Sequence, residues 1–403
     1  MATTTPPGLV SLRDTGAPTV TNDAQARHRD RGDRAWLAYV VVFAAVCVMV
    51  GVYWDISWHM SIGRDSFWTP AHLLIQSGGL LAGLTSGFVA IKTTFWPSAR
   101  DVGTGVRLWG FRAPLGAWVC IWGCFAMLAS APFDDWWHNA YGLDVKIVSP
   151  PHTVLALGIY AIVNGGLLLS LASQNRAGDE SRARFTMLYL IAGGLLVMNF
   201  AIFLSEYSFR FLQHGEVFYH FSAIFYPFAL VALARGARHR WPATIAAAFY
   251  MGIMLALMWI VQLFPATPML GPIYQDITHM VGMAWPLWLV VPAAGIDFVR
   301  QRLGGRFPSI IEAVILGLVF SVLFVAVQWP WASFMVESPL ARNAFFNADN
   351  FVYWAQPSYV ERSHRFISDG SRFVPAAVET VLIASLSAWA GLGWGTWMSK
   401  VRR

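Results

Sequence analysis

The length, composition and charge of the chain restrict what kind of protein it can be. Its 403 residues are 56% hydrophobic, only 12% are charged, and the formal net charge is +6. Soluble domains are about a quarter charged, so this composition excludes an ordinary soluble protein. Unbroken apolar runs exclude a β-barrel, and no basic stripe interleaved with aromatic residues predicts nucleic-acid binding. The three cysteines all lie in apolar runs, which predicts no disulfide framework.

The first segment of the chain, residues 1–33, is polar and rich in Thr, Pro, Asp and Arg. It contains no apolar core of the kind that a cleavable signal peptide requires. Such a composition cannot bury enough apolar surface to fold alone, so we expect a disordered tail on the cytoplasmic side. The remaining residues, 34–403, are expected to form one polytopic transmembrane domain.

Ten apolar segments follow, each close to the ~20 residues that a helix needs to cross a bilayer. They lie at 35–54, 71–95, 114–133, 151–173, 184–205, 216–235, 242–264, 277–299, 308–329 and 374–398. We therefore predict an all-α integral membrane protein of about ten transmembrane helices, built from repeated two-helix hairpins. The tandem hairpins are 35–95 and 114–173, the diverged hairpins are 184–235 and 242–299, and the last hairpin, 308–398, carries a long outer loop at 330–373.

The connecting loops fall into two alternating sets, one basic and one rich in histidine. Because loops that carry Lys and Arg stay in the cytoplasm, the basic set predicts that both termini are cytoplasmic. The chain has ten histidines, and only His28 and His239 lie on that side. The others lie on or beside the opposite face: His59, His72, His138, His152, His214, His220, His279 and His364. The sequence thus predicts a multi-pass cell-membrane protein whose His- and Asp-rich face lies outside.

A pattern of polar residues occurs twice on this outer face, once in each of the first two hairpins. The first copy has Asp55, His59, Gly63, Asp65, Pro70 and His72, and the second has Asp134, His138, Gly142, Asp144, Pro150 and His152, with one extra residue before the proline. Residues four apart share one face of a helix, so Asp55 and His59 point the same way. A hairpin brings the end of one helix beside the start of the next, where His72 lies. The same reasoning joins the three equivalent residues of the second copy.

Each copy supplies the ligands of a metal site. Two imidazoles and a carboxylate suit copper, iron or zinc, and ionisable residues at membrane depth are costly and usually functional. The predicted ligands are Asp55, His59, His72, Asp134, His138 and His152. Asp65 and Asp144 could add a ligand or orient an imidazole, and Asp135 could replace its neighbour. The pattern leaves open whether the copies form one composite site or two, and whether these residues only cap helices.

Two later loops carry weaker versions of the acid-and-histidine pattern. Glu216 and His220 repeat the four-residue spacing, and Asp276 closely precedes His279. Each pair lies where an outer loop enters the next predicted span. These four residues are candidates for additional ligands or for groups that complete a shared site.

The spacing Asp55-x3-His59-x12-His72 resembles the copper-ligand motif in the C subunit of the particulate methane and ammonia monooxygenases. The resemblance covers these three ligand positions; the second copy is one residue longer, and the family subunit has fewer spans. In that family an Asp and two His hold a copper ion in the membrane region, and the complex hydroxylates methane, ammonia or short hydrocarbons. The resemblance therefore implies copper, a small lipophilic substrate and partner subunits.

The leading expectation is a copper-dependent membrane oxidoreductase, similar to a monooxygenase, or the metal-bearing subunit of one. Its partners would be the lipid bilayer, a small lipophilic substrate, and either other subunits or further copies of the chain in a homo-oligomer. A second interpretation is a transporter for a metal or another small solute, because tandem hairpins are familiar in transporters. A third is a non-catalytic subunit of a membrane complex, in which the repeated residues act as helix caps.

Overall fold

The computed structural model describes residues 35–63, 68–97, 105–142, 149–367 and 372–402. The chain divides after residue 36: the part before the division is described only at the start of one helix, and residues 37–403 form one compact unit. The structure is all-helical, with 74% helix in 11 helices, so the predicted all-α class is confirmed. The predicted tail, 1–33, lies outside the described residues.

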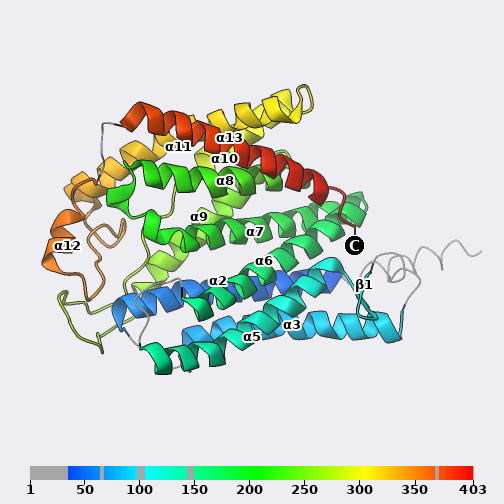
Figure 1. The fold of residues 1–403 in the computed structure, drawn as a ribbon, viewed down its shortest axis with the longest axis horizontal. Coiled ribbons are helices and arrows are strands. Elements are labelled where there is room, and N and C mark those ends of the chain that lie inside the picture. Colours follow the sequence, from blue (N-terminus) through cyan, green and yellow to red (C-terminus); the bar gives the residue numbers. More distant parts are fainter. Residues whose placement is uncertain (1–34, 64–67, 98–104, 143–148, 368–371, 403) are drawn as a thin grey trace, which may run out of the picture. The chain divides into compact units, whose positions relative to one another are not determined.

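Nine helices of the described chain are long and apolar enough to cross a membrane. They are α2 (Ala35–Ser61), α3 (Pro70–Phe95), α5 (Leu115–Tyr141), α6 (Pro150–Arg176), α7 (Asp179–Phe203), α8 (Glu216–Gly236), α9 (Pro242–Val261), α11 (Ser309–Glu337) and α13 (Phe373–Met398). The hairpins α2–α3 and α5–α6 turn at the same end of the bundle as the connection from α11 to α13 (Figure 1). These helices support a multi-pass protein in a lipid bilayer.

The eighth predicted span, 277–299, is wrong, because the chain has no helix across residues 277–289. Helix α10 (Val290–Leu303) has only 14 residues and begins near the middle of that span. The non-helical part is apolar because protein covers it, and Val281 is fully buried. Pro286 opposes a helix there, since proline lacks the backbone N–H and clashes with the preceding turn. Nine described helices, rather than the predicted ten, have the length and composition of a span.

The backbone of residues 277–289, called the unwound segment below, is paired with side chains of the surrounding helices. Non-helical backbone at membrane depth is tolerated only where protein or a water-filled cavity satisfies its polar groups. Four N–H groups donate to side-chain oxygens: Val281 to Ser61 Oγ (2.7 Å), Met283 to Tyr53 Oη (3.0 Å), Leu287 to Tyr250 Oη (3.0 Å) and Trp288 to Gln328 Oε1 (3.0 Å). The unwound segment is thus fixed against α2, α9 and α11.

Small residues let the helices of the first two hairpins approach closely, as is common in membrane bundles. Gly83 of α3 packs against Cys124 of α5, and Gly165 of α6 packs against Cys120, so a side chain at either glycine would overlap the cysteine. Both cysteines are free and buried within these contacts. They therefore serve as packing residues that hold α5 between α3 and α6.

Shorter elements lie in the connections between the long helices. An antiparallel pair of strands, β1 (Val106–Leu108) and β2 (Phe111–Ala113), follows α3. The connections at the other end contain η1 (Ser205–Tyr207), η2 (Arg210–Leu212), η3 (Pro339–Ala341) and α12 (Pro357–Arg362). The predicted outer loop, 330–373, is shorter than expected. Helix α11 extends to Glu337 and so covers the first positions of the predicted loop, and the short helix α12 interrupts the remainder.

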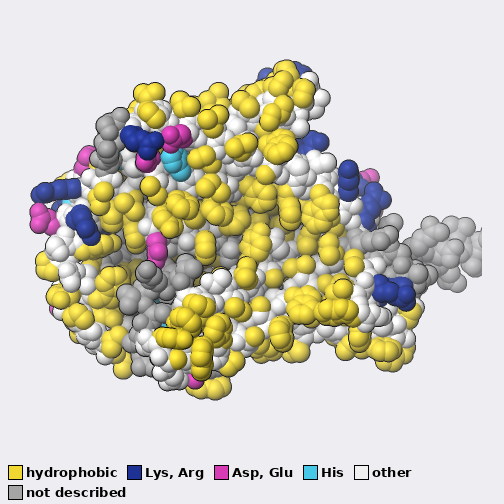
Figure 2. All heavy atoms as spheres, viewed as in Figure 1, with side chains coloured by type: hydrophobic (Ala, Val, Ile, Leu, Met, Phe, Trp, Pro, Cys, Tyr) yellow, Lys and Arg dark blue, Asp and Glu magenta, His cyan; other side chains and the backbone are white. Residues whose placement is uncertain are grey.

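Apolar side chains cover the middle of the bundle on the face shown in Figure 2, and charged side chains gather toward the helix ends. Several large apolar residues of the long helices are exposed, among them Phe43, Leu84, Phe125, Val322 and Leu386. An apolar surface between polar ends is what a lipid bilayer requires of the protein that crosses it.

Candidate metal centres

The first group of predicted ligands lies where α2 ends and α3 begins. Asp55 and His59 belong to the last two turns of α2, and His72 belongs to the first turn of α3. His72 Nε2 lies 3.0 Å and His59 Nε2 lies 3.8 Å from Asp55 Oδ1. One ligand atom of each residue lies within 4.8 Å of the others. The hairpin therefore brings together the three side chains that the spacing places on neighbouring helix ends.

The local sequence explains why His72 faces this group. Thr69 is the N-cap of α3, and its hydroxyl accepts the His72 N–H at 3.4 Å. Pro70 occupies the first helical position, where its missing N–H costs nothing. Gly63 has a φ of +98°, which favours glycine, and lies directly after α2. The glycine and the cap together determine where the third ligand begins its helix.

The second group has the same construction at the end of α5 and the start of α6. His138 Nε2 lies 3.4 Å and His152 Nε2 lies 3.5 Å from Asp134 Oδ1, and the three ligand atoms lie within 4.8 Å of one another. Ser149 is the N-cap of α6, and its hydroxyl accepts the His152 N–H at 3.4 Å. Gly142 has a φ of +86°. The cap, the proline and the glycine therefore hold equivalent places in both hairpins.

The shared carboxylate oxygen accepts no hydrogen bond in either group. Asp55 Oδ1 and Asp134 Oδ1 are both buried atoms without a hydrogen-bond partner. A buried carboxylate oxygen that accepts no hydrogen bond costs free energy. Two imidazole nitrogens lie within ion-pairing distance of this oxygen in each group, and a cation at their common point would bind the oxygen and both nitrogens. The residues present therefore fit a metal ion.

A hydrogen bond determines which nitrogen of His138 carries the proton. Its Nδ1 lies 3.1 Å from the carbonyl oxygen of Gly142, and a carbonyl only accepts, so Nδ1 is the donor. In a neutral imidazole the other nitrogen, Nε2, then presents a lone pair. Nε2 is the atom that faces Asp134. Histidines that bind metals are commonly oriented in this way by a bond to a backbone carbonyl.

Both groups are accessible from the surroundings of the bundle. The exposed side-chain fractions are 21% for Asp55, 27% for His72 and 49% for His59, and they lie between 23% and 37% in the second group. Three protein ligands leave positions open on a bound metal, as catalytic metal sites require. An exogenous ligand could therefore reach a metal held by either group.

The two groups differ in what supports them. The end of α2 accepts two backbone hydrogen bonds from the connections that follow α9 and α11, residues 262–276 and 338–356, which are called the outer segments below. Tyr353 N–H donates to Met60 O (3.2 Å), and Met269 N–H donates to Ile62 O (2.8 Å). Among the described residues, the end of α5 has no such bond from outside its own hairpin. The first group is therefore fixed to the outer segments, and the second is held by its own two helices.

The other acidic residues that the sequence predicted near the ligands do not all lie within the described structure. Asp135 is exposed, and its Oδ2 accepts a hydrogen bond from Asn139 Nδ2 at 3.4 Å, so Asp134 alone belongs to the second group. Asp65 and Asp144 lie outside the described residues. Asp276 and His279 are exposed, next to and within the unwound segment, and His279 Nδ1 lies 3.0 Å from Thr278 Oγ1.

The pair Glu216 and His220 is bound to the start of α13. Arg372 donates to Glu216 Oε1 at 3.1 Å and to Glu379 Oε1 at 3.0 Å. His220 Nε2 lies 3.5 Å from Glu379 Oε2. These residues link α8 to α13 through charge, and within the described chain they are not part of a group that could hold a metal.

Three polar residues that contact the predicted site residues are not among those predicted from the sequence. The N-cap hydroxyls of Thr69 and Ser149 had a readable signal, because Thr/Ser-Pro-x-His occurs in both copies. Glu379 had none, since it lies far along the chain from its partner His220 and belongs to no local spacing.

The described residues contain two separate metal-capable groups, each closed within its own hairpin. In the described residues the six predicted ligands therefore form two groups of three, one in each hairpin. Comparison of the chain with protein-family models, with curated proteins and with solved structures finds no match.

Proposed function

We propose that the chain is a multi-pass membrane metalloprotein that binds two copper ions, one at each Asp–His–His group. The observation that carries this proposal is the buried carboxylate oxygen without a hydrogen bond, present in both hairpins and faced by imidazole nitrogens. Helix caps alone would not need it, because the capping is already done by Thr69 and Ser149.

The ligand chemistry favours copper. Imidazole suits copper, zinc and iron, and affinity for divalent first-row metals is highest for copper at a given site of nitrogen and oxygen ligands. Three ligands with open positions differ from a structural zinc site, which closes its coordination with four protein ligands. The resemblance of the first copy to the copper motif of the particulate monooxygenases points the same way.

We further propose that the chain is a copper-dependent oxidoreductase, similar to a monooxygenase, or its metal-bearing subunit. Copper supplies one-electron and dioxygen chemistry when it is bound. The role of the chain is to hold and orient its ligands through the bond from His138 to Gly142 and through the N-caps. The exposed apolar residues Trp136 and Tyr141 flank the second group, which suits a lipophilic substrate that arrives from the bilayer.

Metal content tests the proposal directly. The full-length chain is purified in detergent with copper, iron and zinc supplied, and the metal per chain is measured by elemental analysis. The expected values are two ions for the natural sequence, one for His72→Ala, one for His152→Ala and none for the double variant. Electron paramagnetic resonance of the copper(II) form should show nitrogen coupling from imidazole, reduced in each single variant.

The control is His279→Ala, which removes an exposed histidine outside both groups and should leave two ions bound. Metal content that is zero, or that does not respond to the His72 and His152 substitutions, would falsify the metalloprotein proposal. Stoichiometric iron or zinc in place of copper would retain the sites and overturn the copper chemistry.

A second candidate function is transport of a metal ion, favoured by the unwound segment. Transporters often place their sites at discontinuous helices near the middle of the membrane, and Ser57 of α2, close to Asp55, bonds the Val281 carbonyl at 2.6 Å. Against this, four N–H groups of the segment already donate hydrogen bonds to side chains, so these groups are not available to a transported ligand. Copper flux into liposomes that contain the chain, abolished by Asp55→Asn, would favour transport over redox chemistry.

A further inference from the structure

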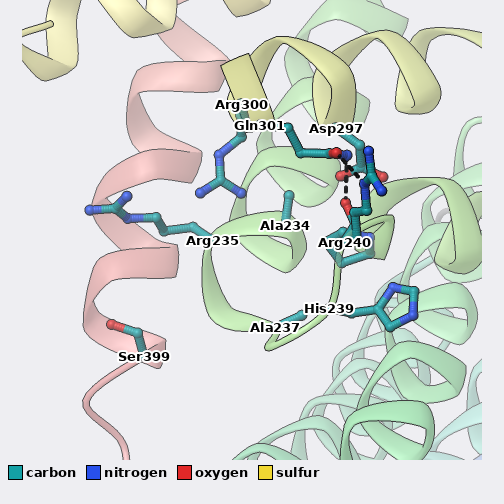
Figure 3. Close-up of a pocket in the computed structure, with 10 residues that line it drawn as sticks. Ala234, Arg235, Ala237, His239, Arg240, Asp297, Arg300, Gln301 and Ser399 are labelled. Atoms are coloured by element: carbon teal, nitrogen blue, oxygen red, sulfur yellow. Dashed lines mark hydrogen bonds between the residues drawn. The ribbon is translucent and has the colours of Figure 1, made fainter. Parts of the chain in front are cut away.

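A cavity of about 330 Å³ is shown in Figure 3. It lies at the end of the bundle opposite to the Asp–His–His groups (Figure 1). It is formed where α8 and α13 end, where α9 begins and where the last turns of α10 pass. Its volume is at the lower end of the ~300–1,000 Å³ that is typical of small-molecule sites. The cavity therefore has room for a small polar group, and its lining decides which one.

Positive charge dominates this lining. Arg235 of α8, Arg240 of the following loop and Arg300 of α10 all line the cavity, and Asp297 is the one carboxylate among the lining residues. Both Asp297 oxygens are occupied at the start of α9, by the Ala243 and Thr244 N–H groups and the Thr244 hydroxyl, at 3.3, 2.9 and 2.8 Å. Within the described chain, Arg235 and Arg240 form no ion pair with a carboxylate. The cavity thus has unbalanced positive charge.

Arg300 is buried where charge is expensive. Its side chain is only 14% exposed, and its Nε lies 3.6 Å from Glu312 Oε1 without forming a hydrogen bond. Burial, and the nearby charge of Arg235, hold the pKa of Arg300 below its usual value, although Glu312 opposes this shift. Arg300 therefore pairs with Glu312 of α11 on one side while it lines the cavity on the other.

Arg240 is held in place before any ligand arrives. Its Nε donates to Gln301 Oε1 at 2.7 Å, and Gln301 Nε2 donates back to the Arg240 carbonyl at 2.8 Å (Figure 3). This reciprocal pair uses only Nε of the guanidinium and fixes its plane. In Figure 3, Arg300 extends from α10 toward the end of α8, where Arg235 begins. The Arg235 side chain itself extends onto α13, where its Nε donates to Thr396 Oγ1 at 3.4 Å, so Arg235 lines the edge of the cavity and Arg240 and Arg300 line the rest of it (Figure 3).

We propose that this cavity binds a phosphate group, held by Arg240 and Arg300. Phosphate offers several acceptor oxygens and a negative charge that would offset the excess positive charge of the lining, and arginine matches its geometry in charge-assisted pairs. The cavity lies at a helix end, where lipid headgroups meet the protein, so the phosphate belongs either to an anionic lipid or to a soluble compound. The site is separate from the Asp–His–His groups and does not rest on the proposed metal function.

Two binding measurements distinguish these sources. In the first, the full-length chain is stripped of lipid in neutral detergent and titrated with inorganic phosphate at constant ionic strength, with chloride as the control anion, and binding is followed by the rise in Tm. In the second, the chain is placed in phosphatidylcholine nanodiscs with or without phosphatidic acid, and retained lipid is identified by native mass spectrometry. Saturable binding in the first measurement alone identifies soluble phosphate, and selective lipid retention identifies the headgroup.

Matched arginine variants show whether binding occurs in this cavity. Arg240→Gln and Arg300→Gln should each weaken binding about tenfold or more, because each removes charge-assisted hydrogen bonds. Arg238→Gln and Arg302→Gln remove the same charge from the same loop and helix, outside the cavity, and should leave binding unchanged; Arg302 lies over the Phe298 ring, 5.0 Å from its centroid. If Arg300→Gln does not fold, the test rests on Arg240→Gln, because Arg240 is exposed and its substitution should not disturb the fold. Absence of saturable binding in both measurements, or equal losses in the control variants, overturns the proposal.

Discussion

His138 Nδ1 donates to the carbonyl oxygen of Gly142, 3.1 Å away, and this bond aims Nε2 at Asp134. Gly142 has a φ of 86° and a ψ of −172°, a backbone conformation that is essentially restricted to glycine. The orientation of a candidate ligand therefore depends on a residue that contributes no ligand atom.

Replacing Gly142 by Ala should weaken metal binding at the second group roughly tenfold or more, which is the usual effect of losing the partner that orients a ligand. The turn would be strained by about 1–3 kcal/mol, and relief of the strain would move the carbonyl that His138 binds. Among the described residues, a Cβ at this position would meet no atom within 4 Å, so a clash with them would not account for the effect. Copper titration of the natural chain and the variant measures it, and an unchanged affinity would refute the orienting role.

Asp134→Asn should release the metal of the second group, whereas Asp135→Asn should leave it bound. The first substitution removes the charge of the oxygen that both imidazoles face. The second removes the charge of an exposed carboxylate that bonds Asn139. Elemental analysis of both variants separates a ligand from a merely nearby charge, and equal metal losses would show that only the net charge of this helix end matters.

Ser61→Ala should loosen the unwound segment. The Ser61 hydroxyl accepts the buried N–H of Val281 at 2.7 Å, and an unpaired buried N–H costs about 1–3 kcal/mol. Ser130 is an apt control, because it is equally buried but donates only to Met127 O within its own helix, at 2.7 Å. Hydrogen exchange at Val281 should accelerate in Ser61→Ala and stay constant in Ser130→Ala. Similar exchange in both variants would mean that the side chains around the segment do not hold it.

Acid should weaken the packing of Phe366 on His214. The His214 ring is stacked between Trp329 and Phe366, with centroids 3.8 and 3.5 Å away, and its Nε2 lies 3.0 Å from the Trp329 carbonyl. Burial lowers the pKa of His214 below 6.5, although its bond to Trp329 and the charge of Glu337 oppose the shift. The packed state therefore takes up the proton less readily than the open state, so stability present above pH 6.5 is lost as the pH falls through that value.

Hydrogen exchange of residues 357–367 at about pH 7.5 and about pH 5.5 measures this effect. His214→Phe keeps a stacked ring that cannot titrate, and it should remove much of the difference between the two values. A smaller dependence should persist from His364, whose pKa is also lowered by burial and by the charges of Arg342 and Arg210, against Asp349. An undiminished pH dependence in the Phe variant would locate the titrating group elsewhere.

The two metal-capable groups could be anticipated because their geometry is local. Asp55 and His59 lie four residues apart on one helix, and His72 begins the next, so a hairpin alone is enough to bring them together. Nothing distant along the chain is needed. That these residues bind a metal, and that the metal is copper, remain predictions.

The unwound segment could not be anticipated, because hydropathy reports burial without saying what covers the residues. A segment buried inside protein can have the same hydropathy as a segment that faces lipid. The groups that replace its helical hydrogen bonds, such as Tyr53 and Gln328, belong to helices far away in the sequence. Pro286 was the local signal against a continuous helix. Glu379, the partner of His220, was missed for the same reason of distance.

The end of α2 accepts backbone hydrogen bonds from Tyr353 and Met269 within three residues of His59. A ligand that orders this helix end must also favour the attached arrangement of both outer segments. Thermodynamic linkage is reciprocal, so a molecule that grips the outer segments would change affinity at the first group by the same factor. Metal occupancy of the first group and attachment of the outer segments to α2 would therefore depend on one equilibrium, and the second group, which has no such bonds among the described residues, would not take part in it.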